Sequence, residues 1–117
     1  MVDKMKDTIE RLREWGCDMD GAMERFLNDE DLYRDCLNAM IEDEAFDGLK
    51  TALDAHNAQE AFGYAHTLKG VLANMGLTPM FDIITLLVEP LRAGNCENLM
   101  PQYEKLIESR EKLKSLM

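Results

Sequence analysis

His66 and Lys69 are the two residues of this sequence whose types and spacing best suit a chemical role. A neutral imidazole is a nucleophile near pH 7 and can take up a phosphoryl group on a ring nitrogen. Side chains three residues apart on a helix are neighbours, so the ammonium of Lys69 would lie beside that group. The phosphoryl group carries roughly 1.5 to 2 negative charges, which a nearby ammonium offsets by on the order of 1 kcal/mol at a surface. Lys69 taken alone would be an ordinary solvated lysine, and its importance comes from its place beside the histidine.

The helix expected around His66 turns this ring away from the core. Over residues 58–75, with an advance of about 100° per residue, the side opposite His66 is mostly apolar. The residues on that side are Leu68, Met75, Tyr64, Val71, Ala61 and Leu72. A lone histidine is ordinarily a hydrogen-bonded core residue, but this geometry places His66 on the solvent side.

Small residues share the face of His66. Gly63, Gly70 and Ala73 lie at helical spacings before and after it. Glycine inside a helix costs about 0.5–1 kcal/mol relative to alanine, so two of them indicate a surface kept clear for the backbone of another protein. Close helix–helix packing is the competing explanation, and it fits less well on a face that carries a histidine and a lysine. Phe62, on nearly the same face, is either a contact within the bundle or an apolar docking anchor.

Helix-length apolar patterns fill the chain and are separated by glycines, prolines and capping residues. The first pattern ends at Gly16, and a second begins at 18 or 20. A third follows a turn at 28–31, a fourth spans 44–55, and the fifth starts after a capping-box-like Asn57 and ends before Gly76. Thr78 is expected to cap a sixth helix whose last turn Pro90 kinks or frays, and the last helix is expected to begin near Asn98.

These patterns predict an all-α fold. Good helix formers dominate the composition, and 117 residues suit one compact domain. Short connectors make successive helices antiparallel neighbours. We therefore expect a single domain over residues 1–117, an antiparallel up-and-down four-helix bundle with short additional N-terminal helices.

Charge and cysteine content exclude several classes of function. The net charge of −10 disfavours nucleic acid and anionic membranes as partners; it serves solubility or, as the less favoured alternative, an acidic docking surface. Three widely spaced cysteines without a CxxC pair predict neither a zinc site nor a disulfide framework. The N-terminus is unlike a signal peptide and no apolar run is long enough to span a bilayer, so a cytoplasmic location is expected.

The segment AHTLKG at 65–70, followed by NMG at 74–76, resembles the AHxLKG…NxG signature of the histidine-containing phosphotransfer family. The resemblance extends to 20–33, where it is to bacterial single-domain members, to 49–62 and to 91–94, and so covers nearly the whole chain. It implies that His66 is phosphorylated on a ring nitrogen, that Lys69 stabilises the phosphoryl charge, and that Gly70 stays small beneath it. Val71 and Leu72 are bulkier than the residues often found there, but both are expected to face the core.

The resemblance also implies partners. The domain would relay a phosphoryl group between the aspartates of response-regulator receiver domains in two-component signalling, with a hybrid sensor histidine kinase as a further candidate partner. We expect no cofactor and no metal on this chain, Mg²⁺ on the receiver, and a monomer. The domain would be a phosphorylated intermediate and not an autonomous enzyme.

Three other functions compete with this one. A histidine kinase would need a phosphate-binding glycine loop and a nucleotide domain, and a metal-binding bundle would need Glu-x-x-His pairs. The sequence offers neither. The remaining alternative is a non-catalytic helical module that binds receivers or other proteins without phosphotransfer.

Overall fold

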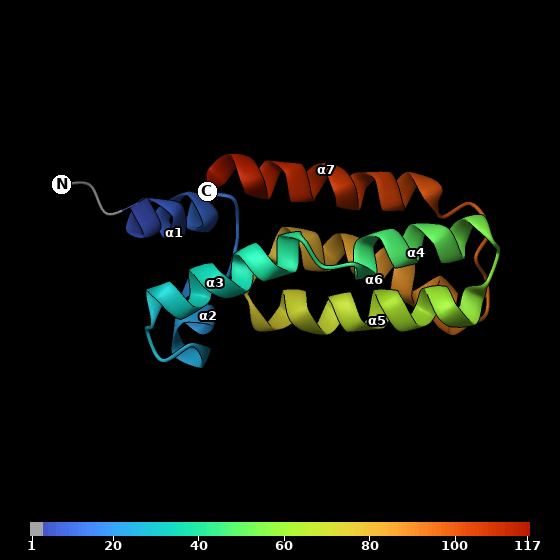
Figure 1. Ribbon diagram of the computed structural model, residues 1–117, viewed down its shortest axis with the longest axis horizontal. Helices are drawn as coiled ribbons and strands as arrows, with labels where there is room; N and C mark the ends of the chain where they lie inside the picture. The colour runs from blue at the N-terminus through green and yellow to red at the C-terminus, as the bar shows by residue number, and fades with distance from the viewer. Residues whose placement is uncertain (1–3) are drawn as a thin grey trace.

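The computed structural model describes residues 4–117, with side chains from residue 6 onward. Within this range the regular structure is entirely helical. The helices are α1 (Lys4–Glu14), α2 (Met19–Arg25), α3 (Glu30–Ile41), α4 (Ala45–Asp54), α5 (Ala58–Asn74), α6 (Thr78–Arg92) and α7 (Met100–Leu116) (Figure 1).

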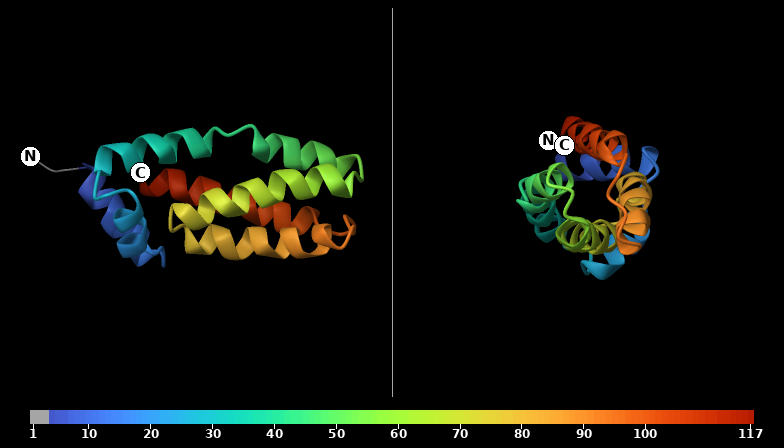
Figure 2. Two further views of the ribbon diagram at one scale, coloured as in Figure 1. Left: turned by 90° about the horizontal axis from the view of Figure 1, so that it is seen from below. Right: turned by 90° about the vertical axis from the view of Figure 1, so that its right-hand side faces the viewer.

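The helices form an elongated bundle that measures 50 × 24 × 21 Å. α4, α5, α6 and α7 run up and down beside one another, and α3 lies end to end with α4 along one side (Figure 2). α1 and α2 sit at one end of the molecule. The predicted all-α bundle with short N-terminal helices is therefore confirmed, whereas the assignment of residues 1–117 to a single domain stays a prediction, because residues 1–3 lie outside the described part.

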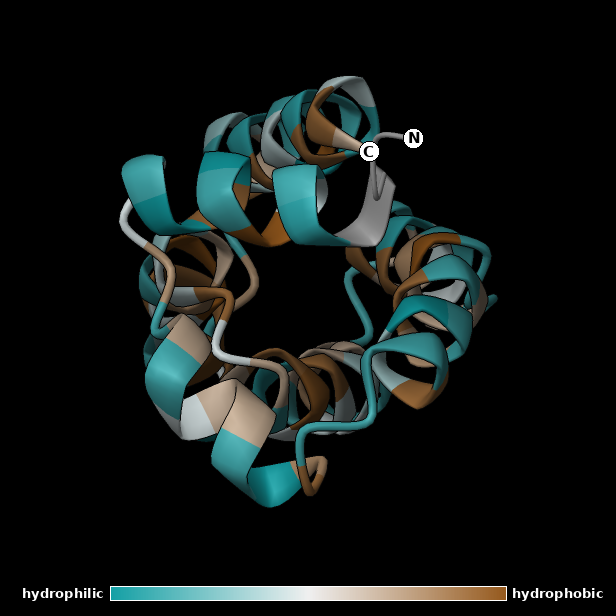
Figure 3. Cartoon of the chain, turned by 90° about the vertical axis from the view of Figure 1, so that its left-hand side faces the viewer, coloured by the Kyte–Doolittle hydropathy of each residue, from teal (hydrophilic) through white to brown (hydrophobic). Residues whose placement is uncertain are grey.

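Apolar side chains face the axis of the bundle. Figure 3 shows hydrophobic residues on the sides of the helices that face one another and hydrophilic residues outside. Large side chains with 0% exposure come from six of the helices, among them Leu12, Tyr33, Phe46, Leu49, Leu68, Leu72, Ile84 and Leu106. Burial at roughly 25 cal/mol per Å² of apolar surface is the main stabilising contribution of such a core. No helix of residues 4–117 is long and apolar enough to cross a membrane.

Local sequence signals fix both ends of α5, the helix that carries His66. At its start, the side-chain oxygen of Asn57 accepts a hydrogen bond from the backbone N–H of Glu60 at 3.1 Å, and the Asn57 amide donates to the Glu60 carboxylate at 3.0 Å. This is the expected capping-box-like start, except that the backbone N–H of Asn57 donates to the Ala52 carbonyl instead. At its end, Gly76 has φ +71°, and a side chain there would collide with the backbone of Asp18.

α6 and α7 differ in detail from the expectation. Leu77 occupies the cap position of α6, so Thr78 is the first helical residue and Pro79 the second. Pro79 is tolerated there because the first backbone N–H groups of a helix have no intrahelical partner. α6 continues through Pro90 to Arg92. α7 begins only at Met100, because Asn98 has a left-handed φ of 60° that no α-helix continues.

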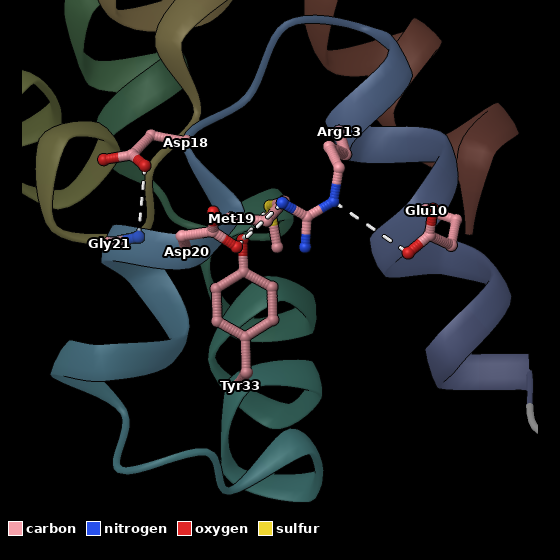
Figure 4. A network of polar contacts seen from close by, with 7 residues as sticks. All are labelled: Glu10, Arg13, Asp18, Met19, Asp20, Gly21 and Tyr33. Atoms are coloured by element: carbon pink, nitrogen blue, oxygen red, sulfur yellow. Dashed lines mark hydrogen bonds and ion pairs between the residues drawn. The ribbon is translucent and has the colours of Figure 1, made fainter.

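The N-terminal helices are tied to one another and to the C-terminal end of α5. Arg13 of α1 pairs with Asp20 of α2 at 2.8 Å, and Asp18 caps α2 (Figure 4). The hydroxyl of Tyr33 in α3 donates to the carbonyl of Met75 at 2.7 Å. Arg25 of α2 donates to the last carbonyls of α5, at 2.8 and 3.1 Å. These contacts hold the end of α5 that lies beyond His66.

Candidate functional site

His66 lies in the middle of α5 with its side chain exposed. The opposite side of the helix is buried as the periodicity predicts, with Tyr64 and Val71 partly exposed. Its fully enclosed residues are Ala61, Leu68, Leu72, Met75 and also Ala65, which the sequence interpretation did not include. The imidazole therefore projects into solvent from α5, and the opposite face of α5 is packed in the core.

The glycines beside His66 leave open space. A Cβ built on Gly63 or Gly70 would have no neighbouring atom within 4 Å. Gly48 of α4 is the opposite case, because a Cβ there would lie 2.6 Å from the ring of Tyr64. Close helix packing thus explains Gly48 but does not explain Gly63 and Gly70. Ala73 is exposed on the same face, so small side chains surround the imidazole on this side and leave it accessible.

Phe62 lies directly against His66. The two rings are stacked, with centres 5.4 Å apart and planes 28° from parallel. Arg92 of α6 places its guanidinium carbon 5.3 Å from the centre of the Phe62 ring. Phe62 is partly exposed and packs against the core, so it supports the imidazole from one side while part of its surface faces solvent.

Lys69 is held between α5 and α6. Its ammonium lies 3.9 Å from a carboxylate oxygen of Glu89 and 5.7 Å from the centre of the Phe81 ring. The other carboxylate oxygen of Glu89 lies 3.7 Å from the guanidinium of Arg92. Two cations therefore share one carboxylate next to the helix face that carries His66.

Sequence reasoning did not assign a role to Phe81, Glu89 or Arg92. All three belong to α6, and their contacts with Lys69 or Phe62 of α5 depend on the register in which α6 packs on α5. A possible signal was the spacing of Glu89 and Arg92, which is that of an ion pair on one helix face. This spacing predicts the Glu89–Arg92 ion pair, but it does not predict that the pair packs against α5.

His56 lies away from this site. It follows the end of α4 with a left-handed φ of 52°, and its ring nitrogen is 4.0 Å from the sulfur of Cys96. His56 therefore stands at the C-terminus of α4, where a positive charge would be favourable. In the part of the chain that the structure describes, no group of three or more histidine, cysteine, aspartate or glutamate side chains is arranged to hold a metal ion.

A helical bundle with an exposed histidine on one of its helices is the arrangement that the resemblance to phosphotransfer domains implies. In agreement, the family model described as Hpt domain matches residues 31–115, well over half of the chain. The chain belongs to this family of histidine-containing phosphotransfer domains, as its signature residues predict. The match begins in α3 and ends in α7, so α1 and α2 lie outside it. No curated protein and no solved structure matched the chain in the corresponding searches.

Membership of the family defines the general activity. Hpt domains take part in phosphotransfer in two-component systems and interact with receiver domains. The roles of individual residues are a separate question, and those given for His66, Lys69 and their neighbours stay predictions.

Proposed function

We propose that this domain carries a phosphoryl group on His66 and exchanges it with the aspartate of response-regulator receiver domains in a phosphorelay. The observation that carries the proposal is the exposed imidazole on α5, with open space above Gly63 and Gly70 and the Lys69 side chain one turn away. A nucleophile that must meet another protein's active site needs this kind of access.

The transfer step involves two bonds. The electron pair of one imidazole nitrogen forms an N–P bond with the phosphoryl group of the receiver's aspartyl phosphate, while the acyl O–P bond breaks and leaves its pair on the aspartate carboxylate. The proton on the other ring nitrogen stays there or passes to water, and the return step reverses both bond changes. In-line transfer of this kind depends mainly on positioning and charge neutralisation.

The neighbouring residues would divide these tasks. Lys69 would offset the charge of the phosphoryl group, and the stacked ring of Phe62 would fix the imidazole plane. Phe62, Gly63, Gly70 and Ala73 would contact the receiver, whose backbone can approach where side chains are small. Mg²⁺ would be supplied with the receiver's own acidic site.

The wider setting is part of the same proposal. The partners would be receiver domains and, as the source of phosphoryl groups, a hybrid sensor histidine kinase. The domain would act as a monomer in the cytoplasm of a bacterium. Its three cysteines are free thiols, which suits a reducing compartment.

Labelling from a phosphorylated receiver tests the proposal. Wild-type protein should acquire an acid-labile, base-stable label when it is incubated with phosphorylated receivers, and His66→Gln should acquire none. His56→Gln is the matched control, because His56 is the other histidine of the sequence and is also exposed; it should be labelled like wild type. Binding of receivers without label on the wild type, with several receivers tried, would favour the non-catalytic module instead.

A further inference from the structure

Glu89 is placed to control the cations beside His66. Its two carboxylate oxygens contact different partners, Lys69 at 3.9 Å and Arg92 at 3.7 Å. Both distances are those of ion pairs and exceed those of direct hydrogen bonds. The Glu89 side chain is 57% exposed, and ion pairs open to water are weak enough to exchange partners.

A phosphoryl group on His66 would compete with Glu89 for the same ammonium. It carries roughly 1.5 to 2 negative charges against the single charge of a carboxylate. The stem of Lys69 is flexible and its Nζ is already held next to α6 by Glu89. Arg92 is less free than Lys69 to move toward the phosphoryl group, because its guanidinium also lies over the Phe62 ring. That ring is itself stacked on His66.

We propose that Glu89 is a positioning residue that holds Lys69 in the unphosphorylated domain and yields it to the phosphoryl group on His66. This inference rests on the proposed function of His66. Because Lys69 must part from Glu89 to reach the phosphoryl group, the ammonium stabilises the new dianion less than a free lysine would. Phosphorylated His66 is therefore a better phosphoryl donor with Glu89 present than it would be if Lys69 and Arg92 acted without this carboxylate.

The test uses a small-molecule phosphoryl donor so that it does not depend on a receiver. Wild type, Glu89→Gln and the control Glu104→Gln are phosphorylated with phosphoramidate, and the phosphoryl group is titrated by ³¹P NMR. Removal of the Glu89 charge favours the dianion and should lower the titration midpoint by about 0.5 pH unit. Glu104→Gln removes the same charge from an exposed position on α7 and should leave the midpoint within about 0.1 pH unit of wild type.

A coupled variant separates positioning from simple charge removal. In a Lys69→Ala background, Glu89→Gln should shift the midpoint by less than half as much, because no ammonium remains to be released. Equal midpoints for wild type and Glu89→Gln, or an undiminished shift in the Lys69→Ala background, would overturn the inference. If the Glu89 shift appears but receivers do not label His66, the relay proposal fails and the role of Glu89 stands.

Discussion

At the scale of single residues, the account depends on an ammonium that neutralises charge where it develops. Lys69→Ala should slow transfer from a phosphorylated receiver to His66 about tenfold, which corresponds to about 1.4 kcal/mol of lost transition-state stabilisation. Lys69→Arg keeps the charge and should retain most of the rate. Single-turnover rates measure both variants, and an alanine variant that transfers at the wild-type rate would remove Lys69 from the mechanism.

Gly70 should separate stability from function. Its missing Cβ leaves open space, so Gly70→Ala should raise the free energy of unfolding by about 0.5–1 kcal/mol through helix propensity. Gly70→Leu should also fold, but should slow transfer at least about tenfold because a bulky side chain displaces the receiver from its reactive distance.

Gly48→Ala is the matched control for Gly70→Ala. Its Cβ would meet the Tyr64 ring at 2.6 Å, so it should lower stability by about 1 kcal/mol or more while transfer stays near the wild-type rate. Urea unfolding and transfer rates test the pair. A Gly70→Leu variant with normal transfer would show that the open face is not a docking surface.

At the scale of helices, the start of α5 depends on one side chain. Asn57→Ala removes the oxygen that accepts from the Glu60 N–H and should lower the free energy of unfolding by about 1 kcal/mol. Chemical denaturation measures this loss. The transfer rate at 25 °C should stay unchanged because the cap only stabilises the first turn, and an equally stable variant would mean that the cap contributes nothing.

Local sequence was enough to predict most helices and the outward direction of His66. Asn57 and Gly76 delimit α5, and the apolar period of this helix sets its buried face. Tertiary packing decides the features that were missed. Arg92 and Glu89 reach the His66 surface only because α6 packs on α5 in one register, which no local pattern specifies. Local sequence therefore predicts the helices and the direction of His66, but it does not predict the contacts between α5 and α6.

At the scale of the whole molecule, a buried thiol couples stability to pH. Burial raises the pKa of Cys17 from 9.0 to about 11, and a backbone contact with Thr78 offsets this only in part. The unfolded chain releases the thiol proton at lower pH than the folded chain. The contribution of the protonated Cys17 thiol to the free energy of unfolding is therefore complete below pH 9. It falls by on the order of 2 kcal/mol as the pH rises from about 9 to 11.

Cys17→Ala should flatten this part of the stability profile. Cys36→Ala, a half-buried cysteine of α3, is the control and should keep the wild-type slope. Denaturant unfolding at a series of pH values from 8 to 11 measures all three proteins (roughly the window in which the thiol titrates). Burial also raises the pKa of the Tyr33 phenol, which should add a loss of stability common to all three proteins. Identical slopes for Cys17→Ala and wild type would contradict the assignment to Cys17.

A relay between two receivers tests the central claim most directly. A receiver that carries labelled aspartyl phosphate is mixed with a second, unlabelled receiver in the presence of this domain, and the label on each protein is followed over time. The account predicts that label reaches the second receiver only with wild type or His56→Gln, after passing through His66. Label that reaches the second receiver equally well with His66→Gln would contradict it, as would wild-type protein that binds both receivers and transfers nothing.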